Sequence, residues 1–332
     1  MNVKALIRRV NHTLKLHMLF PEHSRILVAC SGGPDSMALL HLLQDIARHR
    51  HTKYTLGVAI VDHSIRPESK DEVLWLRNQV DTLGFPFYTT TFDVPSLSKD
   101  LKLSEETVGR QVRYQWLNEI AQSEGYDYIA VAHHKDDQAE SILSHLIRGT
   151  GLNGLTGMAV VSNDYDVPVI RPLLDVTKAE LLAYLAYREL TYCIDSTNDD
   201  IRYQRNRIRH RIIPELESIN PNVVDAIARL GSSISEDLAV ISNLTAQAFD
   251  RLVTIDKHEM SLSRRALRKE PLAIQRRLWQ RLVSSIDSDI TLTTAHQEQL
   301  LDIVNTGEEK TFTIKSIKVT AQCDTIKVYC KH

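Results

Sequence analysis

Short apolar runs alternate with longer amphipathic stretches through the first half of the chain. Near-continuous apolar runs over residues 26–30, 54–61 and 128–132 predict strands that are buried on both faces. Charged stretches with helical spacing lie between them, as over residues 68–83, and residues 177–180 match a capping box that opens another helix. Strands that alternate with helices indicate right-handed crossovers. We therefore expect an α/β fold with a doubly wound, mainly parallel sheet.

The second half of the chain has a different pattern. A turn-rich break over residues 218–222 is followed by two long stretches with helical spacing, over residues 222–250 and 264–285. The last twenty or so residues alternate in the manner of strands. We expect two domains: residues 1–217 form the α/β domain, and residues 218–332 form a smaller, mostly helical domain that ends in short strands.

The sequence Ser-Gly-Gly-Pro-Asp-Ser over residues 31–36 connects the first predicted strand to an apolar helix. Such a turn directs backbone N–H groups and the positive end of a helix at one point, which favours an anion. Glycines let the backbone approach that anion closely, and the hydroxyls of Ser31 and Ser36 add donors. A serine cap on an ordinary turn is the alternative, but the six-residue string after a strand favours phosphate.

Two better-known nucleotide motifs do not describe this turn. One needs a lysine directly after Gly-x-x-x-x-Gly to reach the terminal phosphates, and no lysine follows here; Gly-x-Gly-x-x-Gly is also absent. Asp35 is a candidate magnesium ligand, because Mg²⁺ usually takes one or two carboxylates together with phosphate oxygens. A carboxylate that caps the helix is the alternative for this residue.

Composition limits the classes of function. The formal net charge is −2, so nucleic-acid binding would have to come from a local basic patch. The four cysteines are dispersed and form no Cys-x-x-Cys pair, so we expect neither a zinc ribbon nor a redox dithiol. No apolar run approaches the roughly 18 residues of a membrane span, and the first residues lack the apolar core of a signal peptide. We expect a cytoplasmic protein without a membrane partner.

Residues 132–141 are dense in groups that bind metals, transfer protons or hold amines, namely His133, His134, Asp136, Asp137 and Glu140. One interpretation is a metal site with histidine and aspartate ligands. Another is an acidic pocket that orients a positively charged amine and helps to remove its proton. A polar helix start is the structural alternative. Residues 62–64, Asp-His-Ser, lack the second histidine of the Asp-His-His phosphoesterases, which weakens the hydrolase interpretation.

Arginines gather in two places. Arg110 and Arg113 are three residues apart in a predicted helix, hence on one face, where two guanidinium groups can clamp a phosphate. Residues 202–211 contain five arginines and one aromatic, which is typical of a nucleic-acid-binding surface. Solvated surface arginines are the alternative at both places. A further basic stretch over residues 264–281 favours contact with RNA.

Several strings together resemble the tRNA(Ile)-lysidine synthases, a family of the N-type ATP pyrophosphatases, or PP-loop superfamily. The matching strings, in family order, are residues 31–36, 61–66, 109–114, 132–140, 148–151, 171–174, 195–198 and 205–209. Ser141 stands where threonine is usual in the family, and Ser64 where glycine is common. The chain ends where longer members continue into a domain that grips the tRNA acceptor stem, so that domain is expected to be absent.

The resemblance implies an adenine nucleotide alpha hydrolase-like fold and a concrete reaction. ATP adenylates the C2 oxygen of the wobble cytidine in the CAU anticodon of a minor tRNA(Ile). The ε-amine of free L-lysine then displaces AMP, which gives lysidine. The implied partners are this tRNA, L-lysine and ATP with Mg²⁺, without zinc or an iron–sulfur cluster. The sequence leaves the oligomeric state open, and a homodimer is one option.

Roles for individual residues follow from the same resemblance. The implied ATP-binding residues are Ser31, Gly32, Gly33, Pro34, Asp35, Ser36, Val61 and Asp62. The implied catalytic residues are Asp35, also the magnesium ligand, Arg110 and Arg113 at the α-phosphate, His133 for proton handling or α-phosphate contact, and Asp136, Asp137 and Glu140 for the lysine cation. The candidate tRNA-binding residues come from the basic run and are Arg202, Arg205, Asn206, Arg207 and Arg209.

Three alternatives remain open at this point. A tRNA thiolase of the same superfamily is disfavoured by the dispersed cysteines, because those enzymes generally use a cysteine pair or an iron–sulfur cluster. A metal-dependent phosphohydrolase could use the His-His-x-Asp-Asp segment, and would release phosphate without any dependence on lysine. A non-catalytic tRNA-binding module with a relic loop would release no diphosphate.

Overall fold

A computed structural model describes residues 3–49, 54–64, 68–193, 204–256, 259–306 and 308–330. The chain divides into two compact units, Met1–Ser233 and Ile234–His332. The division falls inside the long helix α11 (Val223–Leu252), whereas the boundary expected from the sequence precedes that helix. Across the described residues, no helix combines the length and the apolar character needed to span a membrane.

The first unit alternates strands and helices. Its elements before α11 are α1 (Val3–Leu16), β1 (Arg25–Ala29), α2 (Pro34–His49), β2 (Thr55–Asp62), α3 (Ser69–Leu83), β3 (Phe87–Thr91), α4 (Val94–Leu101), α5 (Glu105–Ser123), β4 (Tyr128–Ala130), α6 (Lys135–Arg148), α7 (Leu152–Leu155), β5 (Val161–Ser162), β6 (Val169–Ile170), α8 (Lys178–Tyr187), α9 (Gln204–Arg207), the π-helical turn η2 (Ile208–Ile212) and α10 (Ile213–Ile219). The three strands predicted from apolar runs are confirmed as β1, β2 and β4.

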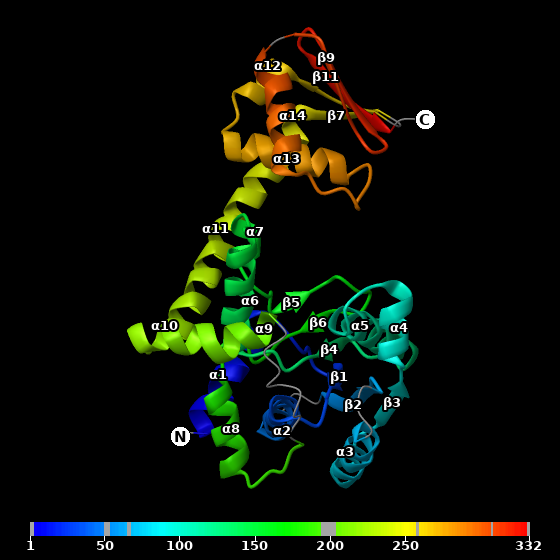
Figure 1. Cartoon of the computed structure of the whole chain (residues 1–332), viewed down its shortest axis with the longest axis vertical. Helices are drawn as coiled ribbons and strands as arrows, with labels where there is room; N and C mark the ends of the chain where they lie inside the picture. The colour runs from blue at the N-terminus through cyan, green and yellow to red at the C-terminus, as the bar shows by residue number, and fades with distance from the viewer. Residues whose placement is uncertain are drawn as a thin grey trace. The chain divides into compact units, whose positions relative to one another are not determined.

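The strands of this unit form one sheet in the order β3-β2-β1-β4-β6-β5 (Figure 1). Neighbouring strands are parallel, except that β5 runs antiparallel to β6. The chain moves outward from β1 through β2 to β3 and then returns to β4, on the other side of β1. The predicted doubly wound, mainly parallel sheet is confirmed. In such sheets, ligands bind at the carboxyl ends of the strands beside this reversal, here between β1 and β4.

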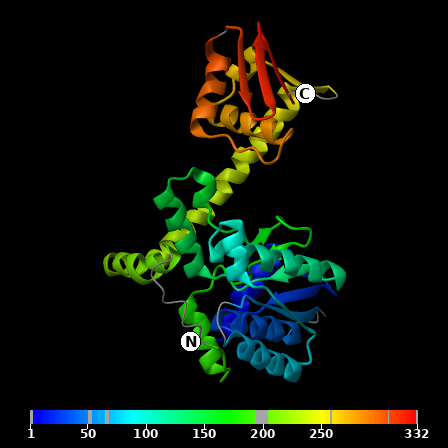
Figure 2. The ribbon, with the colours of Figure 1, turned by 45° about the vertical axis from the view of Figure 1, so that its right-hand side comes forward.

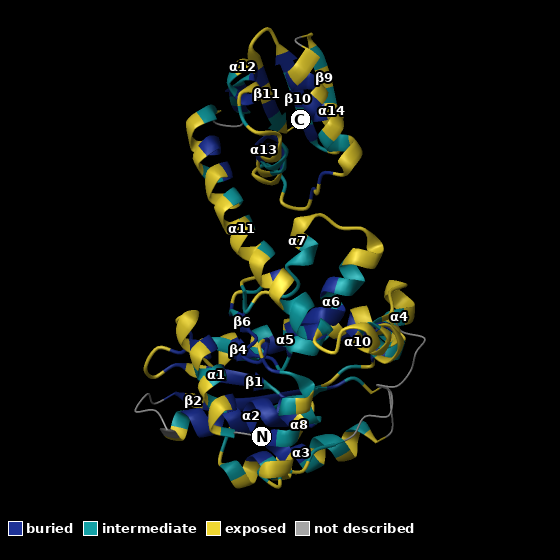
Figure 3. Ribbon diagram, turned by 90° about the vertical axis from the view of Figure 1, so that its left-hand side faces the viewer, coloured by how far each residue is buried: buried dark blue, intermediate teal, exposed yellow. Residues whose placement is uncertain are grey.

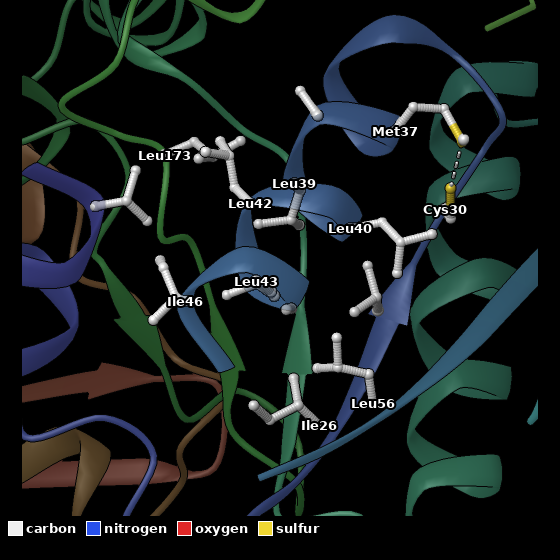
Figure 4. Close-up of a cluster of buried hydrophobic side chains, with 14 of the residues drawn as sticks. Ile26, Cys30, Met37, Leu39, Leu40, Leu42, Leu43, Ile46, Leu56 and Leu173 are labelled. Carbon is white, nitrogen blue, oxygen red and sulfur yellow. Dashed lines mark hydrogen bonds between the residues drawn. The ribbon is translucent and has the colours of Figure 1, made fainter. Parts of the chain in front are cut away.

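Both faces of the sheet are covered, because successive residues of a strand point to opposite sides. Ile26 and Val28 of β1 belong to a core shared with α1, α2, α3 and α8, whereas Leu27 belongs to a second core with α5. Figure 4 shows Leu40 and Leu43 of α2 directed toward the strand side chains of the first core. Burial is therefore continuous through the central strands, as the dark ribbon of Figure 3 shows.

The second unit combines helices with an antiparallel sheet. Its elements after α11 are β7 (Val253–Asp256), β8 (Glu259–Ser263), α12 (Arg264–Arg268), α13 (Leu272–Ser284), α14 (Thr294–Thr306), β9 (Lys310–Ile314), β10 (Ile317–Gln322) and β11 (Thr325–Cys330). The strand order is β7-β8-β11-β10-β9. Helices α13 and α14 pack on this sheet (Figure 2). Trp279 of α13 is fully buried in the core of this unit.

Two details of the second unit differ from the sequence-based expectation. The single helix predicted over residues 264–285 is wrong: it is two helices, α12 and α13, separated around Pro271. Proline has no N–H to donate and cannot continue a helix, but it is tolerated where α13 begins. The hairpin of β7 and β8 was not predicted, since β8 is fixed by pairing with β11, far along the chain.

Candidate active site

The turn predicted to bind an anion lies between β1 and α2. The Ser36 hydroxyl holds it together: its oxygen accepts the N–H of Ser31 at 3.2 Å, and it donates to the carbonyl of Gly33 at 2.9 Å. Gly32 has a φ of +78°, a left-handed conformation that favours glycine. Helix α2 begins at Pro34, where the first helical N–H needs no partner. The backbone is thus already shaped as the sequence predicts.

The other predicted nucleotide-binding residues, Val61 and Asp62, end strand β2. This strand lies beside β1, so both residues are at the same edge of the sheet as the turn. Asp62 is buried, and one of its carboxylate oxygens accepts the N–H of Ser64 at 2.8 Å. The carboxylate therefore fixes the bend that follows the strand.

Asp35, the predicted magnesium ligand, is paired with a lysine from far along the chain. Both of its carboxylate oxygens lie 2.6 Å from Nζ of Lys178, the first residue of α8. Burial raises the pKa of Asp35, but the nearby His134 and Lys178 outweigh it and hold that pKa below its usual value. The described residues contain no group of three or more His, Cys, Asp or Glu side chains suited to a metal ion. Lys178 engages both oxygens of Asp35, so this carboxylate is open to a metal ion only when the lysine moves away.

His134 connects Asp35 to the acidic start of α6. Its Nε2 lies 3.7 Å from Asp35 and 3.4 Å from Asp137, and its Nδ1 lies 3.4 Å from Asp136. Burial lowers the pKa of His134, but the surrounding carboxylates raise it to about 9, so the imidazole is positively charged at neutral pH. Asp136 also accepts the backbone N–H of Lys178 at 2.8 Å. The carboxylates of this region are therefore already matched with positive groups.

Asp137 and Glu140 hold two guanidinium groups. Arg205 donates to Asp137 at 2.7 Å and to Glu140 at 2.8 Å. Arg209 donates to Glu140 at 2.6 Å and to Asp137 at 3.1 Å. The Glu140 side chain is only 1% exposed, while those of both arginines are about one third exposed. The structure thus joins the residues predicted for lysine to residues predicted for tRNA.

The spacing of the basic segment explains which arginines face inward. Arg205 and Arg209 are four residues apart, on the side that packs on α6, whereas Arg207 is exposed. Ile208 is buried in a small core together with Ala139 of α6. Asn206 is half-buried. Arg202 lies outside the described residues, as do residues 65–66 and 195–198 of the family strings.

We call this group of matched charges the paired cluster. Its members are Asp35, Asp136, Asp137, Glu140, His134, Lys178, Arg205 and Arg209.

A second group, the arginine cluster, consists of Arg110 and Arg113 of α5 and Arg171, which follows β6. The Cζ atoms of Arg110 and Arg113 lie 5.1 Å and 5.2 Å from the centre of the Tyr114 ring. Arg171 is 6% exposed; it donates to the carbonyl of Ala159 at 2.8 Å, and its Nε has no partner among the described residues. Within the described part of the chain, none of the three forms an ion pair with a carboxylate. Burial lowers the pKa of Arg113 and of Arg171, as does the charge of Arg110.

His133 lies between the two clusters. Burial lowers its pKa to about 3, and although Asp137 acts in the opposite direction, the charges of Arg171 and Arg205 lower it further. Its buried Nδ1 has no hydrogen-bond partner among the described residues. The imidazole is therefore neutral at physiological pH, in contrast to the neighbouring His134.

Three residues of these clusters have no role predicted from the sequence. His134 was only part of a dense polar string, and Arg171 only part of a family string. Lys178 was noted within a capping box, which is confirmed: the Thr177 hydroxyl accepts the N–H of Glu180 at 3.3 Å. Arg171 had one usable signal, since it directly follows a short apolar run, at the carboxyl end of a strand.

Comparisons with known proteins identify the family of the chain. The model of the PP-loop domain family matches residues 3–216. A tRNA(Ile)-lysidine synthase of Nostoc sp. is 32% identical over 84% of this chain and 83% of its own length. The chain belongs to the tRNA(Ile)-lysidine synthase family. A relative of the same name from Porphyromonas gingivalis is 34% identical over 80% of this chain but 56% of its own length. The chain thus spans about half the length of such curated relatives.

Among solved structures, the fold of this family member is similar to that of the U34-tRNA thiolase NcsA from Methanococcus maripaludis with its 4Fe–4S cluster. The TM-score is 0.61 at 21% identity, over 70% of this chain and 78% of the other. At this identity the similarity supports the fold alone, which agrees with the sheet described above.

Proposed function

We propose that this chain ligates free L-lysine to C2 of the wobble cytidine in the CAU anticodon of a minor tRNA(Ile), with ATP as co-substrate and AMP and diphosphate as products. Membership in the tRNA(Ile)-lysidine synthase family supports the proposal. One observation carries it: beside the turn predicted to bind an anion, Asp137 and Glu140 hold cationic side chains, while no carboxylate among the described residues pairs with the arginine cluster. The same edge of the sheet thus suits both a phosphate group and a cationic amine.

In the proposed first step, the C2 oxygen of the cytidine attacks the α-phosphorus of ATP, and diphosphate leaves. The backbone of residues 31–36 binds the diphosphate. Arg110 and Arg113 stabilise the negative charge that develops at the α-phosphate, and none of the described carboxylates pairs with them in competition. Magnesium enters the proposal only as part of the ATP substrate, since Lys178 engages both oxygens of Asp35 before the nucleotide binds.

In the proposed second step, the ε-amine of lysine attacks C2, and AMP leaves with the bonding electron pair. The ammonium group of free lysine must lose a proton before it attacks, and we assign the binding of this cation to Asp137 and Glu140. Asp136 is engaged by His134 and by the N–H of Lys178, so we give it a positioning role. His133, with a pKa near 3, is a poor proton acceptor at neutral pH. Of its two expected roles, we propose the α-phosphate contact.

Arg205 and Arg209 reconcile two expectations about the basic run. Each guanidinium can serve the carboxylates of α6 or an RNA phosphate, but not both fully at once. We propose that lysine displaces at least one of them from Asp137 and Glu140, and that the released arginine contacts the tRNA backbone together with the exposed Arg207.

The decisive experiment mixes the purified chain with ATP, radiolabelled L-lysine and a tRNA(Ile) transcript that has a CAU anticodon. We expect label in the tRNA only when ATP is present, and none in a transcript in which the wobble cytidine is replaced by uridine. Without lysine, diphosphate release should still occur. Asp137→Ala should lose lysine incorporation but retain that release.

Other outcomes would replace the proposal. Phosphate release that does not depend on lysine would indicate a phosphohydrolase. Sulfur incorporation at the anticodon would indicate a thiolase. Tight tRNA binding without any diphosphate release would indicate a binding module.

A further inference from the structure

The anion-binding turn lacks a lysine in the sequence, but the fold brings one to it. Nζ of Lys178 lies 2.6 Å from both carboxylate oxygens of Asp35, which belongs to the turn and is 143 positions away in the chain. The side chain of Lys178 is 35% exposed and that of Asp35 is 28% exposed. The ammonium group is thus at the turn and still accessible to water. A flexible four-carbon stem allows such a group to change partners.

The ammonium group is not needed to place its helix. The first turn of α8 is fixed by the capping box of Thr177 and Glu180, and the backbone N–H of Lys178 is bonded to Asp136. Arg9 also pairs with Glu180 from outside the helix. These contacts use the backbone and other side chains. Because both partners are about one third exposed, the contact between Lys178 and Asp35 contributes less to the fold than the buried contacts of Glu140, and a phosphate can replace it at a lower cost.

We propose that Lys178 binds the diphosphate end of ATP, moving from Asp35 to the β- and γ-phosphates when the nucleotide enters the turn. A carboxylate beside this turn repels an incoming polyphosphate, and a neighbouring ammonium that turns toward the phosphates converts the repulsion into attraction. Lys178 thereby supplies, from α8, the lysine that other nucleotide-binding turns carry within the loop itself. The inference rests on the proposed use of ATP at this turn, but on neither tRNA nor lysine as substrates.

The test is calorimetric binding in EDTA of three probes: AMP, inorganic diphosphate and the non-cleavable analogue α,β-methylene ATP. Lys178→Met should lower the affinity for diphosphate and for the ATP analogue by about tenfold or more, the effect of one lost charge-assisted contact. The affinity for AMP should not change. Lys178→Arg should retain most of the affinity. Arg9→Met is the matched control, because it removes a different cation that contacts the first turn of α8, through Glu180. This variant should bind all three probes as the unaltered chain does.

A second variant tests the exchange of partners. Asp35→Asn removes the carboxylate that competes for Lys178, so diphosphate should bind at least as tightly as to the unaltered chain. Equal losses for AMP and diphosphate in Lys178→Met, no loss at all, or weaker diphosphate binding in Asp35→Asn would each overturn the inference. If the unaltered chain binds diphosphate as expected but transfers no lysine to tRNA, the proposed function fails while this inference stands. If it binds no diphosphate, the inference fails.

Discussion

The paired cluster and the arginine cluster lie at the same edge of one sheet and balance their charge in opposite ways. In the paired cluster, every carboxylate has a positive partner from the chain itself; Glu140, for example, is held by Arg205 and Arg209. In the arginine cluster, the guanidinium groups face an aromatic ring and one another, and none of the described carboxylates pairs with them. The first is complete without a ligand, whereas the second lacks an anion.

This difference separates stability from binding. Removing one partner of a matched, buried pair strands the other, so such residues should affect folding. Removing one of several like charges relieves repulsion, so such residues should affect ligand binding and leave folding intact. A cationic ligand of the paired cluster competes with an arginine for Asp137 and Glu140, while an anionic ligand of the arginine cluster competes with none of the described carboxylates.

The largest effect should come from the arginine cluster. We expect Arg113→Gln to slow tRNA-dependent diphosphate release by about 100-fold, since it removes a donor from the charge that develops in the transition state. Its thermal unfolding temperature should be unchanged or higher. Arg77→Gln is the control, because Arg77 also lies over an aromatic ring, 5.1 Å from the centre of Phe87, but belongs to neither cluster. A less stable Arg113→Gln variant with intact activity would contradict the comparison.

The second effect belongs to the paired cluster. Glu140→Gln should lower the free energy of unfolding by about 2–3 kcal/mol, because two guanidinium groups lose their buried counter-charge. Denaturant titration measures this change, and the double variant with Arg209→Met should recover part of the loss. Asp302→Asn, which breaks the exposed pair with Lys310, should have no measurable effect. Equal losses in Glu140→Gln and Asp302→Asn would mean that burial does not distinguish these pairs.

A smaller effect should follow from adding ligands. Saturating AMP should raise the unfolding temperature by about 2–4 °C for each 1 kcal/mol of linked binding free energy, because the arginine cluster gains its anion. The shift should disappear in the double variant Arg113→Gln, Arg171→Met. L-Lysine should give a smaller shift, since it has to displace Arg205 or Arg209. A larger shift with lysine than with AMP would reverse the comparison.

The smallest effect concerns His133, between the clusters. Its folded-state pKa of about 3 lies below the roughly 6.5 of an unfolded histidine, so it contributes stability that is present above pH 6.5 and is lost as pH falls toward 3. Between about pH 7 and pH 6, His133→Asn should lose roughly 0.7 kcal/mol less than the unaltered chain. Denaturant titrations at both pH values measure the difference. The same loss in both proteins would place His133 in a more hydrated setting.

Features that depend on contiguous residues were predictable. The strand-to-helix turn at residues 31–36, the apolar strands and the capping box at the start of α8 all follow from patterns a few residues long. The prediction of one helix over residues 264–285 was wrong, because a proline interrupts the pattern at Pro271, between α12 and α13. It was incomplete where a strand exists because of a distant partner, as β8 does beside β11.

By itself, the sequence determined the fold class and singled out most of the charged residues of the candidate site. Only the tertiary structure decided which charges are matched. Glu140 and Arg205 were assigned to different substrates, yet they share hydrogen bonds, and Lys178 had no assigned role until the fold placed it on Asp35. The reason is physical: an ion pair or a shifted pKa depends on distance in space and on burial, and neither can be read from positions that are 65 or 143 residues apart in the chain.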